Sequence, residues 1–170
     1  EIGLAAANSI NWARVLAQVV YYFAAAVALG APHRPVNFSV PTGNFGDIFA
    51  GHIARQMGLP IGTLLIATNE NDILHRTLQT GLSENIGVEP TIAPSMDIQI
   101  SSNFERLIFD LYDKDGAAVV QLMQEQKQCG SFRLSQGAWH RFREGWASGR
   151  ADRTETLAMI KSVSHDGGTI

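Results

Sequence analysis

The chain has 170 residues, of which 45% are hydrophobic, and this is enough for one domain with a sizeable core. Its formal net charge of −3 argues against a nucleic-acid-binding surface, which would be strongly basic. No apolar run reaches the length of a membrane span, and the single cysteine, Cys129, excludes an intrachain disulfide. These features predict a cytoplasmic protein with neither nucleic acid nor a membrane as a partner.

A long, mostly apolar helix is predicted over residues 10–29, and its composition leads us to expect that it is buried. Three polar residues interrupt the apolar pattern at spacings of three and four, namely Asn11, Arg14 and Gln18. They therefore share one face of the helix. Such a stripe either meets solvent or lines a site, and the pattern alone favours solvent.

Residues 36–67 have the pattern of a strand, a helix and a second strand, which is the usual size of a right-handed βαβ unit. The first strand, 36–40, alternates apolar and polar residues, whereas the second, 63–67, is an apolar run suited to a buried parallel strand. The helix between them, 48–57, stops at Gly58. The pattern predicts an α/β fold in three layers, with a mostly parallel sheet flanked by helices.

The turn between the first strand and the helix is a candidate anion site. Gly43 and Gly46 permit backbone angles that other residues avoid, and they remove side chains from the surface of the turn. The first N–H groups of the helix, and the positive end of its dipole, would point into the turn and attract a phosphate. From the glycine spacing alone, a phosphate site and a tight turn without a ligand are about equally favoured.

Two nucleotide-binding motifs are incomplete at this turn. A dinucleotide site needs G-x-G-x-x-G, of which only Gly43 and Gly46 are present, although Glu70 or Asp72 could then bind a ribose. A P-loop needs a lysine after its last glycine, and His52 stands there instead. What remains is a turn suited to one compact phosphate.

The rest of the chain is predicted to be mostly helical and to serve packing. A third strand is expected at 88–92, and Trp139, Phe142 and Trp146 are core candidates. Further helices are predicted over 72–80, 103–112, 115–128, 135–146 and 152–165. With no internal repeat or linker, residues 1–170 are expected to form a single α/β domain.

Metal-binding and nucleophilic residues are poorly placed for chemistry. The five histidines form no His-x-x-x-His pair, and Cys129 has no visible base, so no metal site and no cysteine nucleophile are predicted. A Schiff-base lysine needs surroundings that lower its pKa. None of the three lysines, Lys114, Lys127 and Lys161, has such surroundings in the sequence, so no catalytic residue is predicted in this chain.

Four segments together closely resemble threonine synthase, in order and in spacing. They are residues 8–14 (NSINWAR), 40–47 (VPTGNFGD), 67–72 (ATNEND) and 94–106 (PSMDIQISSNFER). The resemblance runs from about Asn8 to Leu111, and more loosely to Ile170. It implies a fold type II pyridoxal-phosphate enzyme, a lyase that converts O-phosphohomoserine and water into threonine and phosphate.

The resemblance also implies roles for particular residues. The phosphate of pyridoxal phosphate would be bound by Gly43, Asn44, Phe45, Gly46 and Asp47. The phosphate of O-phosphohomoserine would be bound by Ser9, Asn11 and Arg14. Arg14 suits this role because a guanidinium is always charged and matches a phosphate in shape.

The departures from the family pattern limit what the chain could do alone. The family's Schiff-base lysine follows a phenylalanine, and no Phe-Lys pair occurs here; a downstream Asp-Pro-His-Thr segment is also absent. The chain is therefore expected to be a central part of a larger enzyme, to need the remaining N- and C-terminal portions as partners, and to be inactive by itself. The alternatives are a related pyridoxal-phosphate lyase or dehydratase, and a non-catalytic module that binds a phosphate ligand. The sequence does not indicate an oligomeric state.

Overall fold

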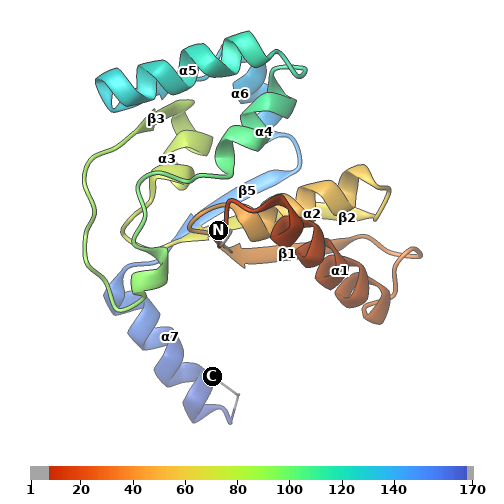
Figure 1. Ribbon diagram of the computed structural model, residues 1–170. Coiled ribbons are helices and arrows are strands. Elements are labelled where there is room, and N and C mark those ends of the chain that lie inside the picture. The colour runs from red at the N-terminus through yellow and green to blue at the C-terminus, as the bar shows by residue number, and fades with distance from the viewer. Residues whose placement is uncertain (1–7, 168–170) are drawn as a thin grey trace, which may run out of the picture.

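The structure, a computed structural model, describes residues 8–167 and has the predicted α/β fold, with a parallel sheet flanked by helices (Figure 1). The helices are α1 (Trp12–Ala28), α2 (Gly46–Gln56), α3 (Ile73–Thr80), α4 (Phe104–Leu111), α5 (Gly116–Cys129), α6 (Gln136–Arg143) and α7 (Arg153–His165), with a short 3₁₀ turn at Pro94–Met96. The strands are β1 (Val36–Pro41), β2 (Ile61–Thr68), β3 (Leu82–Glu84), β4 (Ser131–Arg133) and β5 (Trp146–Arg150). Within this part of the chain no helix is both long and apolar enough to cross a bilayer.

The main sheet consists of three parallel strands in the order β1-β2-β5. β1 pairs with β2 as far as Pro41↔Ala67, and β2 pairs with β5 as far as Thr68↔Arg150. The carboxyl ends of the three strands therefore lie at one edge of the sheet, which is where open α/β sheets bind ligands. A separate antiparallel pair, β3 and β4, lies near α5 (Figure 1).

The prediction of a third strand at 88–92 is wrong. The structure gives this segment no strand, because the backbone of Glu89 pairs with a side chain instead of a neighbouring strand. The Glu89 N–H donates to Asn71 Oδ1 and the Glu89 carbonyl accepts from Asn71 Nδ2, both at 2.8 Å. Pro90 follows directly and has no N–H to contribute to a sheet.

The third strand of the sheet lies in the second half of the chain, which was predicted to serve only packing. The helix predicted over 135–146 ends at Arg143, because Gly145 adopts a positive φ of 75° and turns the chain into β5. Phe142 and Trp146 are buried in the core as predicted, while Trp139 is only partly buried. The second half therefore completes the sheet as well as covering it.

Several helices pack on one face of the sheet, the face that carries Leu64 and Ile66. A Cβ on Gly51 of α2 would lie 3.0 Å from Leu64 Cδ2, and His75 Nδ1 of α3 lies 2.9 Å from the hydroxyl of Ser148, which pairs with Ile66. Right-handed crossovers that advance in one direction across a sheet place their helices on the same face. The opposite face is less covered, since Leu65 and its neighbours Ser39 and Ala147 are partly or fully exposed.

The first helix is less buried than its composition predicts, so that expectation is wrong. Only four side chains of α1 are buried, Val15, Val19, Tyr22 and Ala26. The other side of the helix is also apolar but faces outward, with Trp12, Leu16, Val20 and Val27 exposed by 41%, 48%, 62% and 62%. We call these four residues the outer stripe of α1.

Candidate functional site

A cavity of about 120 Å³ lies at the carboxyl end of β1, between the following turn and the N-terminal part of α1. Its lining consists of Ser9, Arg14, Gln18, Pro41, Thr42, Gly43, Asn44, Phe45, Gly46, Asp47 and Ile48. This volume is smaller than the few hundred Å³ of a typical small-molecule pocket, so the cavity suits a phosphate-sized group. The structure thus brings the predicted cofactor residues together with two of the predicted substrate residues, Ser9 and Arg14.

The turn that forms this cavity has its unusual backbone angles at Phe45, not at the two glycines that the sequence singled out. Phe45 has φ 65° and ψ 0°, in the left-handed region. It is 1% exposed, stacks on Trp146 with ring centroids 5.6 Å apart, and meets Phe104 edge-on at 5.2 Å. This conformation costs a non-glycine residue about 1–2 kcal/mol, and the aromatic packing holds it in place.

The glycines are needed for close approach. A Cβ on Gly43 would lie 3.1 Å from Ile98 Cδ1 and 3.2 Å from the carbonyl oxygen of Ser95. A Cβ on Gly46 would lie 3.3 Å from Asn103 Nδ2. The segment 94–106 therefore lies directly against the turn, and both glycines make room for it.

Backbone N–H groups of the turn are available to an anion. Within residues 8–167 the structure gives no protein acceptor to the N–H groups of Gly43, Asn44, Phe45 and Gly46. Thr42 just before them is fixed, because its N–H donates to the Ala67 carbonyl at 2.8 Å. Four donors at the start of an 11-residue helix could bind an anion with the help of the helix dipole, and we call the turn of Gly43, Asn44, Phe45 and Gly46 the cradle.

Asp47, the last of the predicted cofactor residues, lines the cavity, but its carboxylate is held elsewhere. Tyr22 Oη donates to the Asp47 carbonyl at 3.0 Å and to Asp47 Oδ1 at 3.1 Å. Burial, reinforced by the charge of Asp47, raises the pKa of Tyr22, so the phenol stays protonated and remains a donor. The Asp47 carboxylate, whose negative charge would repel a phosphate, is therefore hydrogen-bonded to α1.

The polar stripe of α1 divides between two roles. Arg14 and Gln18 line the cavity, so the stripe faces a site, although its pattern favoured solvent. Asn11 is not part of the lining; it caps α1, and its Oδ1 accepts from the Ala13 N–H at 2.9 Å. Of the three predicted substrate residues, the structure therefore places Ser9 and Arg14 at the cavity and Asn11 beside it.

The segments 67–72 and 94–106, which are far apart in sequence, meet at Asp97. The Asp97 carboxylate accepts from Thr91 Oγ1 at 2.7 Å, the Thr91 N–H at 2.8 Å, Asn69 Nδ2 at 2.8 Å and Asn71 Nδ2 at 3.1 Å. The hydrogen bonds from Thr91, followed by those from the two asparagines, lower the pKa of Asp97. These contacts close the loop that carries Ile98 onto Gly43.

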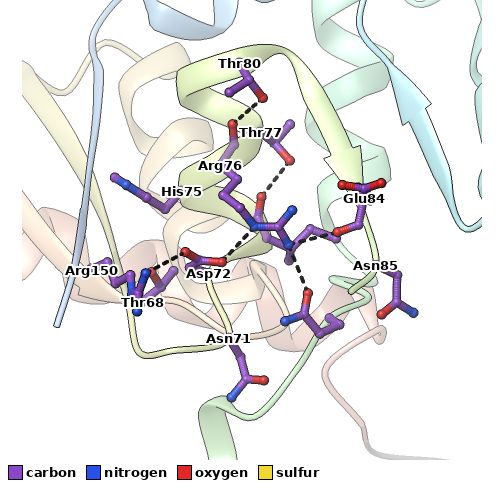
Figure 2. A network of polar contacts seen from close by, with 12 residues as sticks. Thr68, Asn71, Asp72, His75, Arg76, Thr77, Thr80, Glu84, Asn85 and Arg150 are labelled. Carbon is purple, nitrogen blue, oxygen red and sulfur yellow. Dashed lines mark hydrogen bonds and ion pairs between the residues drawn. The ribbon is translucent and has the colours of Figure 1, made fainter. Parts of the chain in front are cut away.

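A second polar network is centred on Asp72, one of the two residues that a dinucleotide site would use (Figure 2). Asp72, only 6% exposed, accepts from Arg76 Nε at 2.8 Å and lies 3.5 Å from Arg150 Nη1, so it joins α3 to the end of β5. Glu70 Oε1 accepts from the Arg153 N–H at 2.7 Å. Both acids have structural partners, which weakens the dinucleotide alternative.

Sequence reasoning missed two residues behind the cradle. Ser101 Oγ donates to the Gly43 carbonyl at 2.7 Å. Asn103 is fully buried, and its Nδ2 donates to the Ser9 carbonyl at 2.8 Å and to the Asn44 carbonyl at 3.0 Å. Asn103 directly precedes α4, but its side chain makes no cap hydrogen bond and is used for these long-range contacts instead. No signal in the sequence pattern marks these long-range contacts.

Other titratable residues lie away from the cavity. The three lysines are exposed, and none lines it. Among the described residues, no group of three or more metal-binding side chains could hold an ion. His52 of α2 faces α4, where its Nε2 lies 3.1 Å from Asp110 Oδ2. Burial lowers the pKa of His52, and the hydrogen bond with Asp110 partly opposes this shift.

No family model matches the chain, but individual proteins resemble it closely. It is 50% identical to threonine synthase of Pseudomonas aeruginosa over 167 residues, and 45% identical to that of Saccharomyces cerevisiae over 170. A crystal structure of pyridoxal-phosphate-bound threonine synthase from Brucella melitensis superposes with a TM-score of 0.96 at 57% identity, and covers 98% of this chain. The yeast enzyme superposes with a TM-score of 0.86 at 45% identity, and covers 92%.

The chain is homologous to part of threonine synthase. It covers 36% of the Pseudomonas enzyme, 33% of the yeast sequence and 36% of the Brucella structure. The chain thus spans about a third of the length of the threonine synthases that it matches. The cavity and its cradle lie within this shared third.

Proposed function

We propose that the intact protein that contains this chain is a threonine synthase, a pyridoxal-phosphate-dependent lyase that converts O-phosphohomoserine and water into threonine and phosphate. The observation that carries the proposal is the cavity of about 120 Å³ that Ser9 and Arg14 line together with the turn, whose four N–H groups have no acceptor within residues 8–167. Homology to about a third of threonine synthase supports it. In this reading, residues 1–170 are one α/β part of the enzyme, and a cytoplasmic location stays a prediction.

The cradle fits the phosphate of pyridoxal phosphate. Backbone donors at a helix start bind a phosphate without a lysine, and the close approach at Gly43 leaves no room for a side chain there. Gly43, Asn44, Phe45 and Gly46 would donate these hydrogen bonds, while Tyr22 holds the carboxylate of Asp47. When bound, the cofactor supplies the electron sink for elimination and water addition on the substrate.

The substrate's phosphate is assigned to the α1 side of the cavity. Arg14 supplies a permanent positive charge, and Ser9 and Asn11 lie on the segment that enters the helix. These residues bind and orient the phosphate that leaves during the reaction. The cavity is lined by the cradle residues and by two of these three residues, Ser9 and Arg14, so the two phosphates would bind close together.

Arg14→Ala in the intact protein tests the assignment. We expect KM for O-phosphohomoserine to rise about tenfold to hundredfold, because a hydrogen bond to a charged group is lost. Arg34→Ala, in the loop before β1 and outside the cavity lining, is the matched control and is expected to leave KM unchanged. An unchanged KM and kcat in Arg14→Ala would refute the substrate-phosphate role.

The isolated chain is proposed to bind the cofactor's phosphate without supporting turnover, because none of its lysines lies at the cavity. Borohydride reduction of the chain mixed with pyridoxal phosphate is expected to attach no cofactor to Lys114, Lys127 or Lys161. Peptide mass analysis would detect such attachment. Specific attachment at one of these lysines would favour an independent catalytic unit.

A further inference from the structure

Asn103 connects the two phosphate-binding segments from behind. Its side-chain nitrogen donates to the Ser9 carbonyl at 2.8 Å and to the Asn44 carbonyl at 3.0 Å, and its own backbone N–H donates to the same Asn44 carbonyl at 3.1 Å. Ser9 belongs to the substrate-phosphate segment, and Asn44 belongs to the cofactor cradle. One buried amide therefore spans both.

Arg106 extends this connection along α4. Its Nε donates to Asn103 Oδ1 at 3.1 Å, and its Nη2 donates to the Ile10 carbonyl at 2.8 Å. Its guanidinium also lies 5.0 Å from the ring centroid of Trp12. The start of α4 thus holds the chain just before α1 at two successive carbonyls, those of Ser9 and Ile10.

The contacts of Asn103 also orient the cradle. The Asn44 carbonyl points back toward α4, as does the Gly43 carbonyl, which accepts from Ser101 Oγ at 2.7 Å. Engagement of these carbonyls behind the turn leaves the N–H groups on the cavity side. The hydrogen bonds therefore preorganise the donors before an anion arrives.

We propose that Asn103 is a positioning residue that sets the spacing between the substrate-phosphate segment and the cofactor cradle. This inference rests on the proposed function and adds a residue that touches neither ligand. The side chain is fully buried, and both hydrogens of its amide nitrogen and its oxygen are used. Only an amide supplies two donors and one acceptor in this shape. Loss of the amide should therefore weaken both sites together.

The test compares four variants of the intact protein. Asn103→Asp has the same shape but cannot donate when ionised, and Asn103→Ala removes the amide altogether. Ser101→Ala removes a contact to the cradle alone. Thr77→Ala removes a buried hydrogen bond inside α3, from Thr77 Oγ1 to the Ile73 carbonyl at 2.7 Å, and controls for a general loss of stability.

Two affinities are measured for each variant. The first is the Kd of the cofactor-free protein for pyridoxal phosphate, obtained by fluorescence titration, with inorganic phosphate as a second probe. The second is KM for O-phosphohomoserine at saturating cofactor. We expect both Asn103 variants to raise both quantities roughly tenfold. We expect Ser101→Ala to raise only the cofactor Kd, and Thr77→Ala to lower the melting temperature while leaving both affinities intact.

Each outcome has one interpretation. If folded Asn103 variants keep both affinities, or lose only one, the positioning role is wrong while the proposed function stands. If Asn103→Asp does not fold, Asn103→Ala carries the test, and failure of both to fold would assign Asn103 a purely structural role and overturn the inference. If the unsubstituted protein binds no pyridoxal phosphate and does not turn over O-phosphohomoserine, the proposed function itself fails.

Discussion

The hydroxyl of Tyr22 donates to both the carbonyl and the carboxylate of Asp47, and so joins the middle of α1 to the first turn of α2. Tyr22→Phe would free this carboxylate beside the cradle. We expect a loss of about 1 kcal/mol in unfolding free energy and weaker binding of inorganic phosphate, because an anion would then meet an unengaged negative charge. Urea denaturation and phosphate titration measure the two effects. Tyr21→Phe, at a position 65% exposed, is the matched control and is expected to change neither.

The close packing of α1 on α2 leads to a second prediction. A Cβ on Gly51 would lie 2.5 Å from Tyr22 Cε1 and 3.0 Å from Leu64 Cδ2. Gly51→Ala is therefore expected to separate the two helices and to lower the melting temperature, although alanine favours a helix. Gly116→Ala, at the start of α5 with nothing within 4 Å, is the control and is expected to be neutral or slightly stabilising. Equal melting temperatures for the two variants would contradict the packing argument.

The aromatic cluster around the cradle leads to a third prediction. Phe45→Ala removes a fully buried ring that stacks on Trp146, and is expected to cost about 3–5 kcal/mol of unfolding free energy. Phe109→Ala removes a ring that is 39% exposed and should cost clearly less. Chemical denaturation of both variants gives the comparison. A similar loss in both would mean that packing at Phe45 does not hold the turn.

His52 predicts how stability depends on pH. Burial lowers the pKa of His52, so the folded state disfavours the protonated ring, whereas the unfolded chain takes up a proton near pH 6.5. The unfolding free energy is therefore expected to fall as the pH drops below about 6.5, and to be independent of this group above it. Denaturation at pH 7.5 and pH 5.5 measures the slope. His52→Gln should flatten it, whereas His165→Gln, with a side chain 91% exposed, should keep it.

Short-range sequence patterns were enough to predict the first βαβ unit. The unit of β1, α2 and β2 follows from strand alternation, a glycine stop and an apolar run, and the structure shows it with ends shifted by a few residues. The helices predicted over 115–128 and 152–165 also form, and the side chains of Asp115 and Asp152 cap their first turns. The strand β5 could not be predicted, since Trp-Ala-Ser-Gly-Arg has a short, partly polar pattern and becomes a strand only because β2 offers it an edge.

The candidate site was predictable only in outline. The glycine turn indicated a candidate anion site, whereas the pattern of the polar stripe favoured solvent. The resemblance selected Ser9, Asn11 and Arg14, of which the structure places Ser9 and Arg14 at one cavity with the turn. The supports at Ser101 and Asn103 could not be predicted, because each acts on a backbone carbonyl more than 50 residues away. The left-handed backbone conformation of Phe45 could not be predicted from the sequence either, because tertiary packing overrides the preference of a phenylalanine for negative φ.

The outer stripe of α1 affects how this chain can be handled as a separate polypeptide. Four large or branched apolar side chains lie along one helix face in water, Trp12, Leu16, Val20 and Val27. If the chain is part of the threonine synthase proposed above, other portions of that protein can cover such a face, whereas the separate chain would bury it against other copies at high concentration. Co-expression of the chain with the other portions of the proposed threonine synthase should therefore increase the yield of dispersed protein.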